Sequence, residues 1–393
     1  MKLIWKLLCT LCIAISSLAL AAGDPPKWIA EGPYVDETSI EIDVPMEVLA
    51  TKLFVEVEVG GLPRRFVFDT GSPSMISAQL ASEMKLEVVD RTKGKDAHGA
   101  VVDTDIMQAD FSLGGTTFHK VPVFVAEFPK VAQCLFDGVI GSELLPLCAW
   151  QIDVQDSRLR CNTNLKALEH VEVAGRQTLH DFGYPHAPIF DIRLAREASS
   201  KAMLDTGSPE YLAISPADLE GARRNGGMGK TVSGYGSSGG SLGGRAPDTT
   251  QQQAELKSLS IGTLSLGRVV ATLRESAPSL IGASVLEHFV VTLDNRLLSA
   301  YFESYRDGPY ARSSFGFSLD FEDAVTVSRV WDGSPAANAG LKVGQRIASI
   351  NGQAVETSCA GIRRAMKAVS ESDAITLETN GESRTLERKP NIP

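Results

Sequence analysis

The chain has 393 residues, which is too long for one ordinary hydrophobic core and predicts two or three domains. Hydrophobic residues make up 43% of the sequence and charged residues 22%, the composition of a globular protein. The formal net charge of -10 argues against a surface that binds nucleic acid or anionic lipid, because phosphate binding needs clustered Lys and Arg. The net charge does not distinguish among other classes of substrate.

Residues 1–22 have the pattern of a signal peptide. Lys2 and Lys6 form a positive segment, an apolar run follows over residues 7–20, and Ala19-Leu20-Ala21 fits the small-x-small cleavage pattern. The apolar run is shorter than the roughly 20 residues that span a bilayer, so cleavage is favoured over a retained anchor. We therefore expect an exported protein, periplasmic or secreted, with no permanent membrane span.

The next part of the chain, up to about residue 302, is rich in predicted strands. Residues 55–59 alternate between apolar and acidic side chains, and residues 65–68 continue after a Gly-Gly-Leu-Pro turn. Further expected elements are short buried strands at residues 121–125 and 269–273 and short surface helices at residues 77–85 and 215–223.

Four cysteines follow the signal peptide: Cys134, Cys148, Cys161 and Cys359. An oxidising compartment permits disulfides, and four cysteines allow three full pairings that the sequence does not distinguish. Cys148 and Cys161 lie in consecutive stretches expected to be neighbouring strands, so their pairing is the first hypothesis. Cysteine and histidine are not spaced as metal ligands are, and no metal is expected.

An internal duplication organises residues 48–302. Residues 66–73, FVFDTGSP, recur as residues 202–209, AMLDTGSP, and Val-Ile-Gly at residues 139–141 recurs as Leu-Ile-Gly at residues 280–282. Asp-Thr-Gly alone is a weak signal, but two extended copies followed by the same pattern in the same order make coincidence a poor explanation. The alternative for each Asp, a turn residue before Gly, does not explain the repetition.

Two carboxylates brought together from the two copies, Asp69 and Asp205, could hydrolyse a peptide bond without a metal or an organic cofactor. Like charges a few ångströms apart resist double ionisation, so the pair shares one proton. The ionised partner would act as the general base for water, and the protonated partner would polarise the carbonyl.

The residues around each Asp fit this role. Glycine lacks a Cβ and allows a close approach of the two loops, the threonine hydroxyls can bond across the junction, and the serine hydroxyls can donate to the outer carboxylate oxygens. The supporting residues are therefore Thr70, Gly71, Ser72, Thr206, Gly207 and Ser208.

These paired motifs resemble the pepsin and retropepsin superfamily of aspartic proteases over about residues 48–302. The resemblance implies a bilobal β fold, a dyad of Asp69 and Asp205 that shares a proton, and a cleft for an extended peptide formed within one chain. Two departures stand out: Pro73 and Pro209 replace the serine usual in pepsin-like enzymes, and no pepsin flap with its tyrosine is evident. The flap candidates are a hairpin at His98-Gly99 in the first lobe and Gly234-Tyr235 in the second.

After a polar linker at residues 303–312, residues 315–386 resemble a PDZ domain of the type attached to exported bacterial proteases. The resemblance rests on the segments AGLKVG, residues 339–344, and ING, residues 350–352. It implies that a turn of backbone N–H groups holds the terminal carboxylate of a peptide, which then adds to a strand edge, at Gly316, Phe317, Ser318 and Leu319. The alternative is a domain that packs on the lobes and binds nothing.

We therefore predict a mainly β protein with a signal peptide (residues 1–22), a first lobe (23–165), a second lobe (166–305) and a PDZ-like domain (310–390). The predicted function is aspartic endopeptidase activity on peptides or proteins outside the cytoplasm, with the PDZ-like domain docking a partner or regulating the cleft. One alternative is a non-catalytic exported peptide-binding protein with the same fold. Another is a protease of narrow scope that is gated by the PDZ-like domain.

Overall fold

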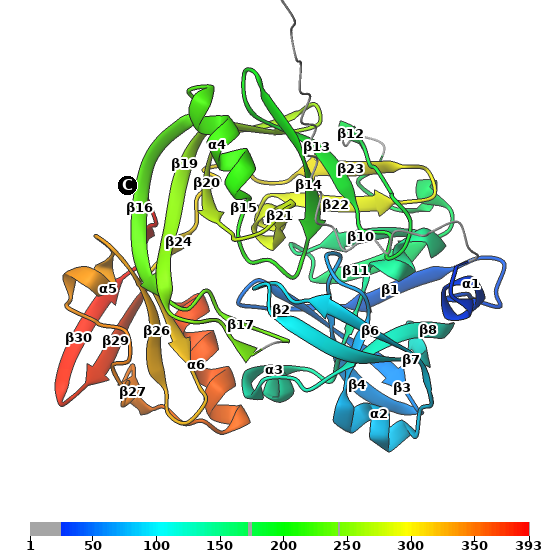
Figure 1. The fold of residues 1–393 in the computed structure, drawn as a ribbon, viewed down its shortest axis with the longest axis horizontal. Coiled ribbons are helices and arrows are strands. Elements are labelled where there is room, and N and C mark those ends of the chain that lie inside the picture. Colours follow the sequence, from blue (N-terminus) through cyan, green and yellow to red (C-terminus); the bar gives the residue numbers. More distant parts are fainter. Residues whose placement is uncertain (1–24, 172–174, 243, 393) are drawn as a thin grey trace, which may run out of the picture.

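The computed structural model describes residues 25–171, 175–242 and 244–392 (Figure 1). The predicted signal peptide lies outside the described residues. The fold is mainly β, with 49% of residues in strands and 16% in helices, which confirms the predicted fold class. No helix among the described residues is long and apolar enough to cross a membrane.

One eight-stranded sheet forms the body of the first lobe. Strands with one buried face alternate buried and exposed side chains, as the sequence predicted for residues 55–59. In spatial order the strands are β2 (Glu47–Leu49), β3 (Lys52–Val59), β4 (Leu62–Phe68), β9 (Gly138–Ile140), β5 (Met75–Ser77), β8 (Thr116–Ala126), β7 (Val101–Leu113) and β6 (Val88–Lys95). Helix α2 (Ala78–Met84) begins at Ser77, whose hydroxyl caps the Leu80 N–H.

The second lobe repeats this topology in a nine-stranded sheet. Its strands in spatial order are β13 (Ile189–Ala195), β14 (Ala198–Asp205), β21 (Ser279–Gly282), β15 (Leu212–Ile214), β20 (Leu264–Leu273), β19 (Thr249–Ile261) and β16 (Met228–Gly236), followed by β26 (Thr326–Trp331) and β25 (Phe317–Asp320). Strand β4 is parallel to β9 as β14 is parallel to β21, and β5 and β15 bridge to their neighbours in the same way. Helix α4 (Pro216–Arg224) occupies the place of α2. The duplication is therefore also present in three dimensions.

A six-stranded sheet is shared by the two lobes. The first lobe contributes β1 (Glu41–Pro45), β11 (Arg158–Asn162) and β10 (Ala149–Asp153), and the second contributes β22 (Phe289–Asp294), β23 (Ser299–Ser304) and β12 (Gly175–Thr178). The lobes meet where β10 pairs with β22. Side chains from both lobes, including Trp150 and Leu293, belong to one continuous buried core. The lobes thus pack as one body rather than as two independent cores.

The remaining elements of the two lobes are short. Four of them are α-helices or strands: α1 (Lys27–Glu31), α3 (Lys130–Leu135), and β17 (Gly240–Ser241) and β18 (Gly244–Arg245), which pair with each other. Three are 3-10 helices: η1 (Ser142–Leu147), η2 (Leu165–Ala167) and η3 (Ala283–Glu287).

The C-terminal domain adds strands, two helices and its own core. Its elements besides β25 and β26 are β24 (Ser313–Ser314), α5 (Pro335–Asn338), β27 (Ser349–Ile350), β28 (Gln353–Ala354), α6 (Cys359–Glu371), β29 (Ala374–Thr379), β30 (Glu382–Glu387) and β31 (Lys389–Pro390). The predicted polar linker at residues 303–312 packs on the second lobe: the Tyr305 hydroxyl donates to the Leu286 carbonyl at 2.6 Å, and Tyr310 stacks on Phe289. Two aromatic side chains fix this segment, so it does not separate the domains as a loose linker would.

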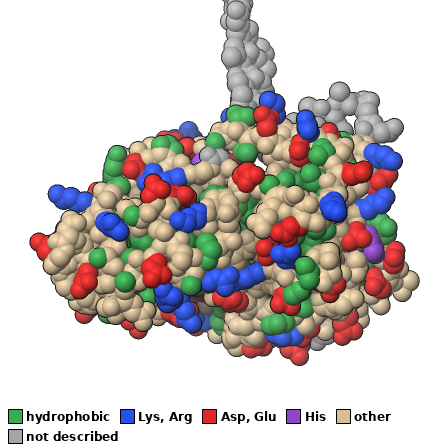
Figure 2. Space-filling view, turned by 90° about the horizontal axis from the view of Figure 1, so that it is seen from below, with side chains coloured by type: hydrophobic (Ala, Val, Ile, Leu, Met, Phe, Trp, Pro, Cys, Tyr) green, Lys and Arg blue, Asp and Glu red, His purple; other side chains and the backbone are tan. Residues whose placement is uncertain are grey.

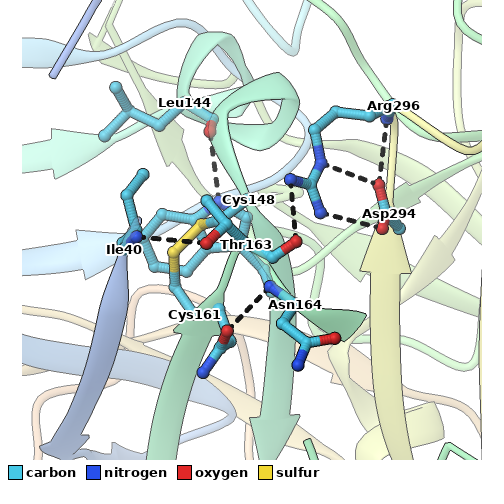
Figure 3. The surroundings of a disulfide bond; sticks show 10 residues. Ile40, Leu144, Cys148, Cys161, Thr163, Asn164, Asp294 and Arg296 are labelled. Atoms are coloured by element: carbon cyan, nitrogen blue, oxygen red, sulfur yellow. Dashed lines mark hydrogen bonds and ion pairs between the residues drawn. A yellow bond between two sulfur atoms is a disulfide. The ribbon is translucent and has the colours of Figure 1, made fainter. Parts of the chain in front are cut away.

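Two disulfides join the four cysteines. Cys148, directly before β10, is bonded to Cys161 of the adjacent strand β11, and Figure 3 shows their surroundings. In the same view Arg296 of the second lobe donates to the Thr163 carbonyl at 3.2 Å and pairs with Asp294. The second bond, Cys134–Cys359, links α3 of the first lobe to α6 of the C-terminal domain across 225 residues of sequence.

The surface seen in Figure 2 carries acidic and basic side chains interspersed over the whole face, with hydrophobic side chains scattered between them. This face therefore shows no large area of one charge sign.

Candidate active site

The two Asp-Thr-Gly segments lie at equivalent positions of the two lobes. Asp69 directly follows β4, and Asp205 is the last residue of β14. Each of these strands runs beside a buried partner strand, and the loop after each Asp is bonded to the residue that follows the Ile-Gly segment of that partner. Ser142 N–H donates to the Ser72 carbonyl at 2.9 Å, and Ala283 N–H donates to the Ser208 carbonyl at 2.7 Å. The repeated Ile-Gly segments thus support the two loops from below.

The two threonines bind the loops to each other with four reciprocal hydrogen bonds. Thr70 donates its hydroxyl to the Leu204 carbonyl at 2.7 Å, and Thr206 donates its hydroxyl to the Phe68 carbonyl at 2.7 Å. Each hydroxyl also accepts the backbone N–H of the other threonine, at 3.0 and 3.2 Å. Both threonines are buried, so water does not compete for these bonds.

The glycines bring each loop against the opposite carboxylate. A Cβ at Gly71 would overlap the carboxyl group of Asp205, and a Cβ at Gly207 would overlap the carboxyl group of Asp69. Any other residue at these positions would force the loops apart, which explains the glycine in both copies. The structure therefore brings the two predicted acidic side chains together at the junction of the lobes.

Backbone N–H groups orient the two carboxylates. Gly71 N–H donates to Asp69 Oδ1 at 3.0 Å, and Gly207 N–H donates to Asp205 Oδ1 at 2.8 Å. The pKa of Asp205 is raised well above its usual range, first by burial and then by the negative charge of Asp69 and a hydrogen bond with it, while the charge of Lys52 opposes the shift. Such a pair retains a proton at a pH where an isolated Asp would lose it.

The two serines differ from their expected role. The buried hydroxyl of Ser72 has no hydrogen-bond partner among the described residues, and Ser208 reaches Asp205 through its backbone N–H at 3.1 Å. The expectation that the Ser72 hydroxyl donates to the carboxylate is therefore not met. The hydrogen bonds that the two Oδ1 atoms accept come from backbone N–H groups instead.

A buried glutamate that the sequence analysis missed lies beneath the first loop. Glu143 is 2% exposed and accepts the Ser74 N–H at 2.8 and 3.1 Å through its two carboxylate oxygens. Burial raises its pKa to about 7. Ser74 in turn accepts the Gly141 N–H at 2.8 Å, so this carboxylate belongs to the scaffold of the Asp69 loop. An acidic residue within the apolar stretch after Gly141 was the only signal for it in the sequence.

Two hairpin tips from the two lobes touch each other. The first tip, residues 96–100 between β6 and β7, includes His98 and Gly99. The second tip, the described part of residues 237–246, contains β17 and β18. Ala97 N–H donates to the Ser241 hydroxyl at 3.3 Å, and the His98 ring lies 3.2 Å from the Ser238 hydroxyl. The structure therefore places His98 and Gly99 at a hairpin tip that reaches the other lobe, and their role as a flap stays a prediction.

Gly234 and Tyr235 are not at a hairpin tip, and this prediction was wrong. Both lie inside β16, which pairs with β19 on one side and with β26 of the C-terminal domain on the other. The sequence could not show that this strand is enclosed on both edges. The segment of the second lobe that stands opposite the first tip is instead the second tip.

The C-terminal domain contacts both lobes. It continues the β16 edge through β26, and Arg245 of the second tip pairs with Asp320 at the end of β25 at 2.8 Å. On the side of the first lobe, α3 packs on α6 beside the disulfide, and Arg363 donates to the Cys134 carbonyl at 3.2 Å. Figure 1 shows this domain beside both β16 and α3.

The segment expected to bind a peptide carboxylate is partly engaged within the domain. Gly316 has a φ of 78° and lies in the turn before β25, where its carbonyl accepts the Trp331 N–H at 2.9 Å. Phe317 is buried in the core of the domain, and Ser318 accepts a hydrogen bond from Arg329. Strand β25, which ends one residue after Leu319, is the last strand of its sheet, so its outer edge is not paired in that sheet.

Comparisons with known proteins agree with both parts of the fold. Residues 55–144 match a family model described as aspartyl protease, and residues 326–379 match a model described as PDZ domain. The chain resembles a single-chain aspartic protease with a C-terminal PDZ domain. The aspartic proteinase from Irpex lacteus is a structural neighbour with 13% sequence identity and a TM-score of 0.43, and the match covers 67% of this chain and 97% of that one. A comparison with the curated proteins found no match.

Proposed function

We propose that this protein is an aspartic-type endopeptidase whose catalytic groups are Asp69 and Asp205. One observation carries the proposal: two Asp-Thr-Gly loops from the two lobes are bonded to each other, and each glycine faces the carboxylate of the other loop. This arrangement holds two acidic groups close enough to share one proton. It needs no second copy of the chain, because both loops belong to one chain.

The geometry supports the following division of roles. Asp205, whose pKa is raised by burial and by Asp69, holds the shared proton. Asp69 takes a proton from a water molecule while the water oxygen attacks the carbonyl carbon, and Asp205 gives its proton to the carbonyl oxygen. In the second step Asp69 passes its proton to the amide nitrogen, the C–N bond breaks, and Asp205 recovers a proton from the gem-diol. Atoms and charge balance, with one water consumed for each bond cleaved.

The substrate class that fits is an extended segment of a peptide or protein. The two touching hairpin tips lie on strands that continue the lobe sheets, which supports a covered, strand-lined binding site. The predicted signal peptide and the two disulfides support action in an oxidising compartment outside the cytoplasm, periplasmic or extracellular.

For the PDZ domain we propose regulation of the cleft through the second tip. The domain is bound directly beside this tip by the β16–β26 pairing and to the tip itself by the Arg245–Asp320 ion pair. A peptide whose C-terminal carboxylate binds at Gly316 to Leu319 would add to β25, the strand that carries Asp320. Peptide binding would thus act on the second tip through β25 and its Asp320. The extensive contacts with both lobes also fit the alternative that the domain packs on them and binds nothing.

Two substitutions, Asp69→Asn and Asp205→Asn, test the proposed chemistry in the full mature chain. We expect the wild type to produce internal cleavages in a complex peptide mixture, mapped by mass spectrometry, and each variant to produce none while it unfolds at the same temperature and still binds peptide. Asp156→Asn, at an exposed turn between β10 and β11, is the matched control and should cleave as the wild type does. If all four proteins bind peptides and none cleaves, the protein is a peptide-binding protein.

A further inference from the structure

A lysine of the first lobe contacts the catalytic loop of the second lobe. Lys52 begins β3 directly after a two-residue turn in which Ala50 and Thr51 both have positive φ, at 50° and 69°. The turn aims the side chain across the lobe junction, where Nζ donates a hydrogen bond to the carbonyl of Gly207. Gly207 is the glycine whose N–H orients Asp205 and whose Cα faces Asp69.

The duplication has no counterpart to this lysine. Phe54 and Ile189 pair with Val67 and Met203, which each lie two residues before the Asp of their lobe. The position of Lys52, two residues before Phe54, therefore corresponds to Ala187, which has no side-chain donor and is followed by Pro188. Pro188 has no side-chain donor, and its carbonyl accepts the Leu204 N–H at 2.9 Å within the second lobe. The lysine contact with a catalytic loop is therefore made by the first lobe and has no equivalent from the second.

Three charged groups act on Asp205 in the described structure. Asp69 raises its pKa, and Lys52 lowers it. The third group is Arg274, which interacts with the charge of Asp205 but whose guanidinium donates to the Pro278 carbonyl and to the Ser276 hydroxyl at 3.2 Å. Arg274 is thus engaged in its own loop, whereas the ammonium of Lys52 is directed at the catalytic loop.

We propose that Lys52 is a positioning residue for the catalytic dyad: its hydrogen bond fixes the Gly207 loop against the first lobe, and its positive charge reaches the pair from that lobe. This inference rests on the proposed function and names a determinant of its pH range. The charge of Lys52 favours the ionised form of Asp205. It therefore moves to lower pH the window in which the dyad holds one proton.

The charge and the hydrogen bond can be separated by three substitutions in the full mature chain. Lys52→Met removes both, Lys52→Gln keeps a donor for the Gly207 carbonyl without the charge, and Lys52→Arg keeps both. Lys257→Met is the matched control, because the Lys257 Nζ also donates to a glycine carbonyl, that of Gly226 at 2.9 Å, at an exposed site.

The measurement is the pH dependence of kcat/KM on a peptide found by product mapping. For Lys52→Met and Lys52→Gln we expect the alkaline limb to move up by about one pH unit, because the pKa of a carboxyl rises on the order of one unit when a nearby opposite charge is removed. Lys52→Arg and Lys257→Met should keep the wild-type profile. Activity that falls by the same factor at every pH, or a limb that moves down, would overturn the inference, because a purely structural contact would not move the limb upward.

A second readout does not need activity. A carboxyl carbon NMR titration, with the Asp205 signal assigned by its loss in Asp205→Asn, should show a higher midpoint in Lys52→Gln than in the wild type. If neither protein cleaves but the midpoint rises, the proposed function fails and the role of Lys52 in setting proton affinity stands. If both cleave and the midpoint is unchanged, the inference about Lys52 fails and the protease proposal stands.

Discussion

The two lobes share a topology but differ in what surrounds the shared loops. Both contain the Asp-Thr-Gly loop, the reciprocal threonine bonds and the Ile-Gly support. Only the first lobe has the lysine that reaches across the junction and the buried Glu143, whose counterpart is Ser284. Among the described residues, the tip of the second lobe alone is bound to another domain, through Arg245. Residues that act as a pair are the same in both lobes, because each one makes its contacts with the copy in the other lobe. Residues that act on the pair from outside have diverged, and these can make two equal carboxylates unequal.

The strongest test of the two matching loops is to add one methyl group to the glycine of either Asp-Thr-Gly segment. Gly71→Ala and Gly207→Ala should each lower kcat/KM by at least about 100-fold, because the new Cβ would overlap the opposite carboxylate and displace the loops by an ångström or so. The two losses should be similar, since the overlaps are alike. Gly221→Ala in α4 is the control, because a Cβ there meets no atom. Unequal losses would show that the loops are less symmetric than they look.

The largest expected difference between the lobes in stability comes from Glu143. Its pKa in the folded protein is raised by burial to about 7, above the ordinary value of 4.5, so the folded state binds the proton more tightly than the unfolded state does. Stability from this group is therefore complete below about pH 4.5 and is lost as the pH rises toward 7. Glu143→Gln should remove this loss, on the order of 3 kcal/mol by linkage.

Denaturant unfolding of the wild type and Glu143→Gln at pH 4 and pH 8 measures this effect, since the two curves should differ more at pH 8. Glu56→Gln, at an exposed position of β3, serves as the control and should leave the pH dependence as it is. An equal difference at both pH values would mean that Glu143 does not titrate between them.

Removing the hydroxyl of either threonine should lower the free energy of unfolding by the same intermediate amount. Thr70→Val removes a hydroxyl that donates to Leu204 and accepts from Thr206, and it leaves a buried carbonyl and a buried N–H without partners. Thr206→Val does the same in reverse. We expect each to lower the free energy of unfolding by about 2 kcal/mol, measured with denaturant. The double substitution should cost less than twice that, because the pairs are shared.

The residues that act as a pair could be predicted from the sequence, whereas the residues around them could not, and the reason is physical. Asp69, Thr70 and Gly71 recur with their copies because local chain geometry and the twofold arrangement require the same residues twice. Lys52 and Glu143 carry no such pattern, since each acts through an approach in space that only the folded chain creates. Gly234 and Tyr235 were assigned to a flap because glycine next to tyrosine resembles a loop, whereas an edge pairing with β26 holds them in a strand. The Cys134–Cys359 bond also depends on how a distant domain sits on α3.

The smallest expected effect tests the link between the PDZ domain and the second tip. The Arg245–Asp320 ion pair is partly exposed, so it contributes at most about 1 kcal/mol. If the second tip helps to cover bound peptide, Asp320→Asn should raise KM by up to about fivefold and leave kcat unchanged, because the tip would be held less firmly while the dyad is undisturbed. Asp323→Asn, an exposed residue in the next loop, is the control. A change in kcat alone would place the effect at the chemistry rather than at the tip, and an unchanged KM would mean that the strand pairing between β16 and β26 holds the tip without help from this ion pair.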